Sequence, residues 1–154
     1  MKYWLMKSEP DVFSIDDLKT KKQSGWDGVR NYQARNFMRD EMKIGDYVLF
    51  YHSSCEIPGV AGLAKVCKES HPDPTQFDPK SDYYDEKATK DNPRWFMVAV
   101  EFVGKSKSYL PLSELKNMKG LEKLPLLQKG SRLSINPVSK EEFSIITSRI
   151  GIDV

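Results

Sequence analysis

The pattern of hydrophobic and polar positions predicts five strands along the chain. Residues 2–7 (KYWLMK) alternate between two faces, as a half-buried strand requires. Residues 46–53 (DYVLFYHS) are apolar on both faces as far as His52, which is typical of a central strand. Residues 59–66 follow after a short loop, so we expect these two strands to pair as a hairpin. Further strands are predicted at 94–103 and at 131–138.

Capping signals and helical spacing predict the helices between these strands. Ser14 and Asp17 form a capping-box pattern, which predicts a short helix at 15–22. Asn31 is expected to cap a helix that runs to about Met42. Ser139 and Glu142 form a second capping box, which opens a final helix that ends before Gly151. A short helix at 112–118 and an apolar turn at 121–127 complete the set.

One long segment, residues 70–93, has no period of its own and is rich in Pro, Asp and Lys. Loops of this length in a compact domain usually cover a functional site or act as linkers. Three aromatic residues, Phe77, Tyr83 and Tyr84, favour the first interpretation. We therefore expect this segment to fold over a site.

The order of these elements defines the fold class. A strand and two helices come first, and mainly strands with short helices follow. No repeat or change of composition divides the 154 residues, so we predict a single domain, 1–154. We expect an α+β domain built around a curled sheet or partly open β-barrel with flanking short helices.

Charge and cysteine content restrict the function classes. The chain has 24 basic and 22 acidic residues, a net charge of +2, which permits nucleic-acid binding without requiring it. Two cysteines and two histidines do not form a familiar zinc-ligand pattern, so we expect no metal and no cofactor. No signal sequence or apolar run of membrane-spanning length is present, so we expect an intracellular protein without a membrane partner, cytoplasmic in a bacterium or nuclear in a eukaryote.

The residues that enzymes use are present but poorly arranged for catalysis. His52, Ser53 and Cys55 lie close together, yet neighbours on a strand point to opposite faces, and no GxSxG elbow occurs. The acidic pairs 16–17 and 141–142 lie in first turns of predicted helices, where the helix dipole already favours negative charge. No Walker loop or GxGxxG motif occurs. We therefore do not expect an enzyme.

Polar and aromatic residues at strand ends and turns are better candidates for a binding site. Trp26, between Gly25 and Gly28, is either an aromatic wall or a hydrophobic plug beneath the following helix. Arg30 and Asn31 either read the edge of a base or phosphate, or cap the helix and form a surface ion pair. Five further residues also have two interpretations: each either contacts a ligand or occupies an ordinary core or solvated position. They are Trp95, Arg132, Ser134, Arg35 and Arg39. Together these residues describe a site for a planar ligand such as a nucleobase.

Six sequence runs resemble an EVE domain over nearly the whole chain. They are WLMKSEP (4–10), WDGVRNYQARNFMR (26–39), FYHSSCEIPGVAGLAKV (50–66), HPDPTQFDP with YYD (71–85), NPRWFMVAVEF (92–102) and SRLSINPV (131–138). EVE domains belong to the PUA-like superfamily and are similar to YTH domains, which bind methylated adenine in an aromatic cage. The resemblance implies a PUA-like fold and a reader of modified bases, either methylated or hydroxymethylated cytosine or methylated adenine, in DNA or RNA.

The resemblance also implies positions for the base pocket. Trp26 matches the first cage tryptophan, and the second cage aromatic is Trp95, Tyr83 or Tyr84. The other pocket positions that the resemblance implies are Ser8, Glu9, Asn31, His52, Ser53, Arg132, Leu133 and Ser134. From their side-chain chemistry we add Arg30 to the pocket and expect Arg35 and Arg39 on adjacent phosphates. Two alternatives stay open: an enzyme that acts on a modified nucleotide with His52 as base, and a protein-interaction module that uses the C-terminal helix or the long loop.

Overall fold

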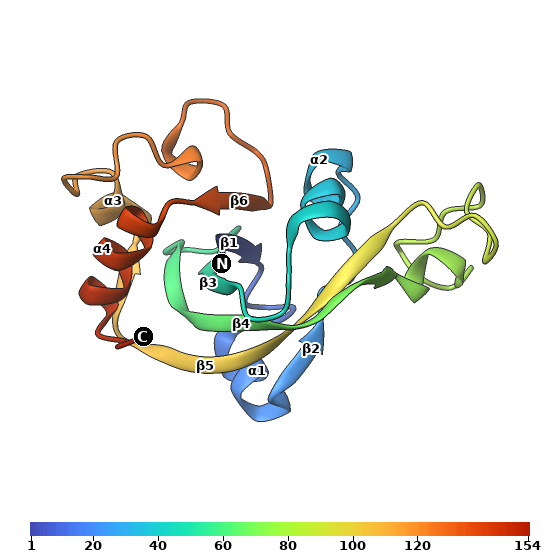
Figure 1. Ribbon diagram of the computed structural model, residues 1–154, viewed down its shortest axis with the longest axis horizontal. Coiled ribbons are helices and arrows are strands. Elements are labelled where there is room, and N and C mark those ends of the chain that lie inside the picture. The colour runs from blue at the N-terminus through green and yellow to red at the C-terminus, as the bar shows by residue number, and fades with distance from the viewer.

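A computed structural model describes all residues, 1–154, and consists of one curled sheet with short helices around it (Figure 1). Its strands are β1 (Tyr3–Ser8), β2 (Gln23–Gly25), β3 (Tyr47–His52), β4 (Gly59–Pro72), β5 (Phe96–Pro111) and β6 (Ile135–Val138). Its α-helices are α1 (Ile15–Lys21), α2 (Tyr32–Asn36), α3 (Leu112–Leu115) and α4 (Lys140–Ile150). A π-helical turn (Phe37–Glu41) and two 3₁₀ turns (Pro74–Phe77 and Pro125–Leu127) complete the elements. No helix has both the length and the apolar character needed to cross a bilayer.

The six strands form one mixed sheet in the order β2-β5-β4-β3-β1-β6. Only β1 and β3 pair in parallel, and the other neighbours are antiparallel. β4 and β5 are long, and their register shifts at four places, which lets this ribbon bend around the others (Figure 1). The sheet is not closed, so the expected α+β fold with a curled, partly open barrel is confirmed.

Two hydrophobic cores lie on opposite faces of the central strands. In β1, Trp4 and Met6 belong to one core, whereas Leu5 belongs to the other. The first core also contains residues of α1 and of the 26–42 segment, and the second core contains residues of α3 and α4. Because consecutive strand residues point to opposite faces, this double burial explains the apolar character of 46–53.

The strand predictions are confirmed for the centre of the sheet and wrong at its margins. β4 continues to Pro72, into a segment predicted to be loop, and β5 runs from Phe96 to Pro111 rather than over 94–103. The polar ends of these two strands pair with each other in a ribbon that has little apolar periodicity. β2 was missed, because three residues are too few to show a pattern. Residues 131–134 precede β6, which begins only at Ile135.

The helix predictions are confirmed at their starts. Both capping boxes form, at Ser14 and at Ser139. The Asn31 side chain accepts a hydrogen bond from the Ala34 amide at 2.9 Å, so Asn31 caps α2 as expected. The helix predicted from there to Met42 is instead α-helical for one turn and π-helical at 37–41. The helix predicted at 112–118 ends at Leu115, and only Pro125–Leu127 of the 121–127 turn is helical.

Candidate functional site

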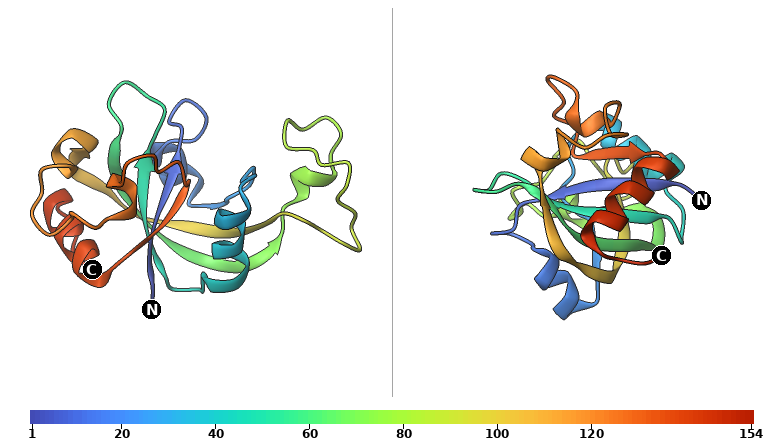
Figure 2. Two further views of the ribbon diagram at one scale, coloured as in Figure 1. Left: turned by 90° about the horizontal axis from the view of Figure 1, so that it is seen from above. Right: turned by 90° about the vertical axis from the view of Figure 1, so that its left-hand side faces the viewer.

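The ends of β1 and β3 meet and hold the loop that follows β1. Their parallel register puts Ser8 beside His52, and the Ser53 amide donates to the Ser8 carbonyl at 2.9 Å. The Ser8 hydroxyl donates to the Phe13 carbonyl at 2.5 Å, and the Ile15 amide donates to His52 Nε2 at 3.1 Å. The loops after β1 and β3 project from the same side of the sheet (Figure 2). Ser8, His52 and Ser53 therefore lie together at one end of the sheet.

His52 is neutral in this arrangement. An amide N–H can only donate, so Nε2 must accept and the ring proton lies on Nδ1. Burial lowers the pKa of His52, an effect that the nearby Asp16 carboxylate partly offsets. The Nδ1–H is left to donate to a ligand.

Aromatic rings surround Phe50 on the same face of the sheet. Trp26 lies edge-on at 5.5 Å between ring centroids, His52 at 5.7 Å and Phe13 at 6.3 Å. Phe50 is fully buried and Trp26 is 8% exposed, with its amide donating to the Val98 carbonyl at 2.8 Å. Trp26 is therefore packed in the core, and little of its surface faces solvent.

Phe13 is a site residue that sequence reasoning missed. It follows the strand end KSEP and immediately precedes the capping box at Ser14, so two local signals fix it at this end of the sheet. It is partly buried against the core that contains Trp26. The signal that could have identified it is an aromatic residue placed between a strand end and the start of a helix.

Leu133 and Ser134 close the same end of the sheet. Leu133 is partly buried against the core that contains Trp26, and its carbonyl accepts from Asn136 Nδ2 at 3.0 Å. The Lys7 amide donates to the Ser134 carbonyl at 2.9 Å. Burial lowers the pKa of the Lys7 side chain. Glu9 and Arg132 are exposed at the margin of this group.

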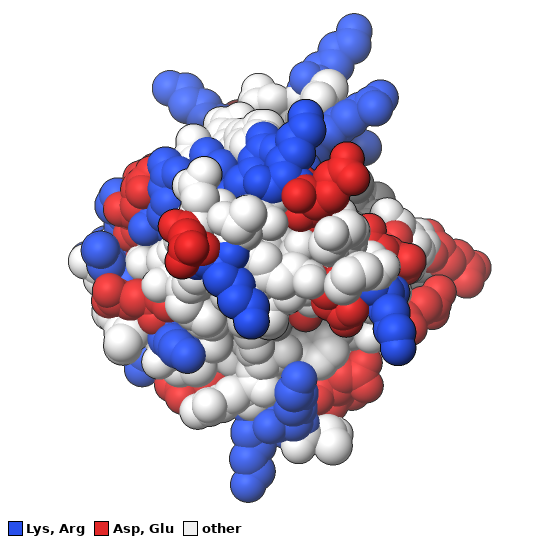
Figure 3. Space-filling view, turned by 90° about the vertical axis from the view of Figure 1, so that its right-hand side faces the viewer, with Lys and Arg blue, Asp and Glu red and all other residues white.

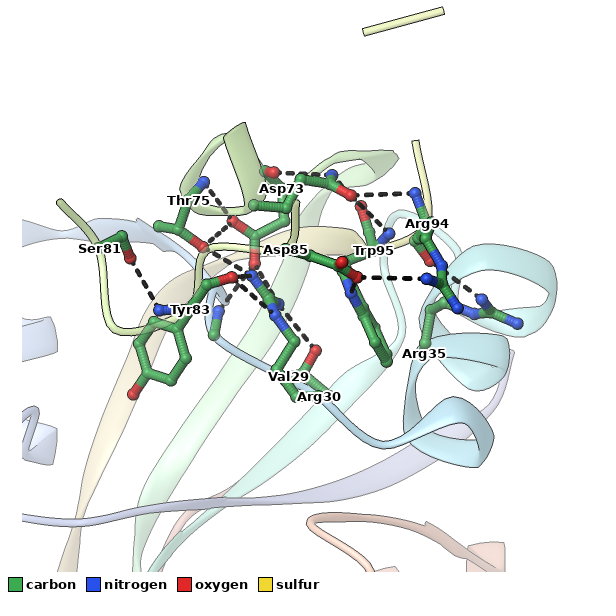
Figure 4. Close-up of polar contacts among 12 residues, drawn as sticks. Val29, Arg30, Arg35, Asp73, Thr75, Ser81, Tyr83, Asp85, Arg94 and Trp95 are labelled. Carbon is green, nitrogen blue, oxygen red and sulfur yellow. Dashed lines mark hydrogen bonds and ion pairs between the residues drawn. The ribbon is translucent and has the colours of Figure 1, made fainter. Parts of the chain in front are cut away.

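Arg30 belongs to a second, separate cluster, drawn in Figure 4, which fixes the 73–95 loop to the segment after Trp26. Its guanidinium donates to Asp73 Oδ2 at 3.1 Å, to Thr75 Oγ1 at 3.0 Å and to the Tyr83 carbonyl at 2.7 Å. The Gly28 amide donates to the same Asp73 oxygen at 2.8 Å. Gly28 has φ +78°, and a Cβ there would lie 2.8 Å from the Tyr83 ring. The hydrogen-bonding groups of Arg30 are thus directed at the protein.

Asp73 is the buried centre of this cluster. Burial alone would raise its pKa, but hydrogen bonds from Thr75, Gly28 and Arg30 outweigh burial and lower the pKa. The carboxylate is therefore ionised at neutral pH and pairs with the Arg30 guanidinium. This pair holds the long loop in place.

Trp95 also lies in the second cluster. Its indole N–H donates to Asp85 Oδ2 at 2.8 Å, its ring stacks on Tyr32 at 4.9 Å, and the Arg30 guanidinium lies 5.2 Å from the ring centroid. Trp95 is 6% exposed, so protein groups cover nearly all of its ring. Tyr83 and Tyr84, the other rival cage residues, are 43% and 45% exposed.

The two arginines expected on phosphates have protein partners. Arg35 donates to Asn36 Oδ1 and to the Arg94 carbonyl, and its guanidinium lies 4.7 Å from the Tyr32 ring centroid. Arg39 pairs with the adjacent Asp40 carboxylate at 2.8 Å. The structure thus brings together Ser8, Trp26, His52, Ser53, Leu133 and Ser134, and it gives Arg30, Asn31, Arg35, Arg39 and Trp95 other contacts.

Other features of the surface do not coincide with this group. A hollow of about 550 Å³ lies at the opposite end of β1, where Tyr3, Trp4 and Pro137 contribute to its walls. No group of three or more His, Cys, Asp or Glu side chains is arranged to hold a metal ion. The strand-end group is therefore the candidate site, and we call it the β1/β3 site (Ser8, Phe13, Trp26, Phe50, His52, Ser53, Leu133 and Ser134).

Comparison with known proteins agrees with the fold. The EVE domain family model matches residues 2–149. Human thymocyte nuclear protein 1 is 48% identical over 164 aligned residues, which cover 95% of this chain and 72% of the human protein. A crystal structure of a protein from Pseudomonas syringae superposes with a TM-score of 0.92 at 53% identity and covers 96% of this chain and 99% of that chain.

A further similar structure includes a ligand. The crystal structure of human thymocyte nuclear protein 1 in complex with DNA that contains 5-methylcytosine superposes with a TM-score of 0.92 at 44% identity. The alignment covers 100% of both chains. The curled α+β sheet is that of the PUA-like class, and within this class the chain belongs to the EVE domain family.

Proposed function

We propose that this chain binds DNA that contains 5-methylcytosine and holds the modified base at the β1/β3 site. The observation that carries the proposal is the likeness of the whole chain to the solved structure of human thymocyte nuclear protein 1 in complex with such DNA. The β1/β3 site adds a physical reason, since it combines aromatic rings with polar groups at the end of a rigid sheet. Methylated adenine and RNA are alternatives that the binding experiment separates.

The base would leave the DNA stack to reach this site. Unstacking costs a few kcal/mol and is compensated by contacts in the protein. The small exposed part of Trp26 and the partly buried Phe13 and Leu133 offer the apolar contacts. Stacking of a base on an aromatic side chain contributes roughly 1–3 kcal/mol.

Polar groups at the site suit the edge of cytosine. The base has acceptors at N3 and O2 and a donor at its exocyclic amine, as its hydrogen-bonding pattern requires. The free Nδ1–H of His52 is a donor for an acceptor of the base, and the Glu9 carboxylate is an exposed acceptor for the amine. We assign these two roles as part of the proposal.

The methyl group by itself gives modest selectivity. Burial of one methyl group is worth about 0.8 kcal/mol, or about fourfold in affinity. Stronger preference requires that the unmodified base leave a gap or an unpaired polar group in the site. We therefore expect a several-fold preference for methylated over unmodified cytosine.

The experiment is fluorescence-monitored binding to a matched panel of oligonucleotides. The panel carries plain, methylated or hydroxymethylated cytosine, or methylated adenine, in DNA and in RNA. Tightest binding to DNA with 5-methylcytosine supports the proposal. Equal binding across the panel refutes it, and a preference for methylated adenine or for RNA replaces it with that ligand.

Two tryptophan variants locate the site. Trp26 and Trp95 are similarly buried, at 8% and 6%, but only Trp26 contacts the rings around Phe50. Leucine at either position removes an aromatic ring from a packed environment, at a cost of about 2–4 kcal/mol. Both variants are therefore compared under conditions where circular dichroism shows them folded. We expect Trp26→Leu to lose the preference for methylated DNA and Trp95→Leu to keep it, and the reverse result would move the site to the second cluster.

A further inference from the structure

Arg35 and Arg39, the cations expected to hold phosphates, contact protein groups. One loop, in contrast, carries positive charges that form no ion pair. Residues 116–132 contain five basic residues and one acidic residue, a net charge of +4. The whole chain has a net charge of +2, so the remaining residues sum to −2. We call this segment the lysine-rich loop. This is a strong local excess of positive charge in a chain whose basic and acidic residues nearly balance.

The cations of this loop have no acidic partners. Six ion pairs occur in the protein, and they involve Lys2, Arg30, Arg39, Arg94, Lys105 and Arg149. None involves Lys116, Lys119, Lys123, Lys129 or Arg132. The one acidic residue, Glu122, accepts a hydrogen bond from the Gly120 amide in its own turn. The loop therefore presents its charge to solvent.

The lysine-rich loop is docked on the protein. Leu121 and Leu124 are fully buried in the second core, beneath the loop. Gln128 Nε2 donates to the carbonyls of Glu122 and Leu124 at 3.0 and 3.1 Å. Because these anchors fix the backbone, the lysines between them are held outward at little further cost in backbone entropy.

The loop ends at the β1/β3 site. Leu133, which packs against the core containing Trp26, follows Arg132 directly. Lys129 lies four residues before Leu133, so its Cα is at most about 14 Å away. Each step along one DNA strand advances about 3.4 Å along the helix axis and places the next phosphate roughly twice that distance away in space, so this reach spans about two neighbouring phosphates. A base held at the site would place its flanking phosphates within range of the loop.

The figures agree with this placement. The lysine-rich loop forms the top of the molecule in Figure 1, where it is drawn in orange. Figure 3 keeps the same vertical direction and shows several basic side chains protruding at the top, whereas basic and acidic side chains are intermixed over the rest of this face. An excess of positive charge at this place attracts a polyanion.

We propose that the lysine-rich loop binds the DNA phosphates that flank the base in the β1/β3 site. The inference rests on the proposed function for its position relative to the base. The loop supplies affinity without reading sequence or methylation, because phosphate contacts are the same for every base. Arg35 and Arg39 are not required for this role.

The test uses two triple variants of the full chain with equal loss of charge. The first replaces Lys119, Lys123 and Lys129 by Gln, and the matched control replaces Lys19, Lys68 and Lys107, which are also exposed and free of ion pairs. Affinity is measured between 50 and 200 mM salt for a duplex with one 5-methylcytosine and for the unmodified duplex. If each loop lysine contacts one phosphate, the slope of log affinity against log salt falls by about 2.7. Over this fourfold rise in salt, the wild type then loses about 40-fold more affinity than the loop variant.

The outcomes separate this proposal from the proposed function. A reduced slope in the loop variant alone, on both duplexes and with an unchanged ratio between them, supports the proposal. Equal effects of the two triple variants, or an unchanged slope in both, overturn it. If the wild type does not prefer the methylated duplex, the proposed function fails, while the slopes on the unmodified duplex still decide whether the loop binds phosphates.

Discussion

The replacement Asp73→Asn tests whether the buried carboxylate anchors the 73–95 loop. Asp73 accepts four hydrogen bonds, from the Gly28 amide, Arg30 Nη1, the Thr75 amide and Thr75 Oγ1, at 2.6–3.1 Å. All four partners are donors. Asparagine keeps one acceptor oxygen but turns an NH₂ group toward donors at the other position, and it leaves the Arg30 charge without its counter-ion.

The magnitude follows from burial. Removing one partner of a fully buried ion pair costs about 3–5 kcal/mol. Asp73 is 1% exposed in its side chain, but the Arg30 side chain is 21% exposed, so water partly stabilises the remaining charge. We therefore expect Asp73→Asn to lower the free energy of unfolding by about 2–4 kcal/mol, a large share of a typical domain's stability.

Urea unfolding at neutral pH measures this loss, with Asp82→Asn as the matched control. Asp82 is an exposed residue of the same loop without an ion pair, so its replacement removes the same charge. Because the pKa of Asp73 is lowered in the folded state, its stabilising effect is complete above the ordinary carboxyl pKa of about 4 and is lost as the pH falls through the lower folded value. A loss within about 0.5 kcal/mol of the control would refute the assignment of Asp73 as an anchor.

Two further predictions concern the sheet. Burial lowers the pKa of His52 in the folded protein, so the unfolded chain takes up a proton first as the pH falls below about 6.5. The free energy of unfolding should therefore decline with falling pH. The variant His52→Gln should lack this part of the decline. Urea titrations at about pH 7.5 and 5.5 compare the two proteins, and equal declines would contradict the prediction. A Cβ at Gly59 would lie 2.3 Å from the Leu110 carbonyl oxygen, so Gly59→Ala should cost at least 1–3 kcal/mol, roughly the cost of overpacking. Gly104→Ala, whose nearest contact is 3.4 Å away, is the control in thermal unfolding, and equal shifts in Tm would show that Gly59 is not sterically required.

The enzyme alternative gains no support from the geometry of His52. Its Nε2 accepts a backbone hydrogen bond from Ile15, and its pKa is lowered by burial rather than tuned by a carboxylate partner in contact. Cys55 lies in the loop after β3 and Ser53 donates its amide to β1. His52 and Ser53 thus hold the chain after β1 in place. This structural role favours a binding site over a site of proton transfer.

Local sequence signals predicted the centre of the fold well. Alternation identified β1, and the apolar runs identified β3 and the start of β4. The capping residues Ser14, Asn31 and Ser139 each start the expected helix. These signals depend on residues within four positions of one another, where chain geometry fixes the distances.

The polar ends of β4 and β5 had no comparable signal. They pair with each other across 24 or more residues, from the pair of Pro72 and Phe96 onward, and both faces of the ribbon are partly solvated, so neither alternation nor apolar runs mark them. A strand of this kind is stabilised by its partner's backbone, which the sequence of either strand alone does not show.

The sequence by itself determined the α+β class and the helix starts, because these follow from short-range geometry. The parallel pairing of β1 with β3, which brings Ser8 beside His52, was decided only by the tertiary structure. Tertiary structure decided what the arginines do. Arg30 meets Asp73 from 43 residues away and Arg35 meets Arg94 from 59 away, whereas the lysine-rich loop meets no acid at all. An arginine fork binds whichever acceptors the fold brings within reach, so spacing along the chain cannot tell a phosphate contact from a structural one.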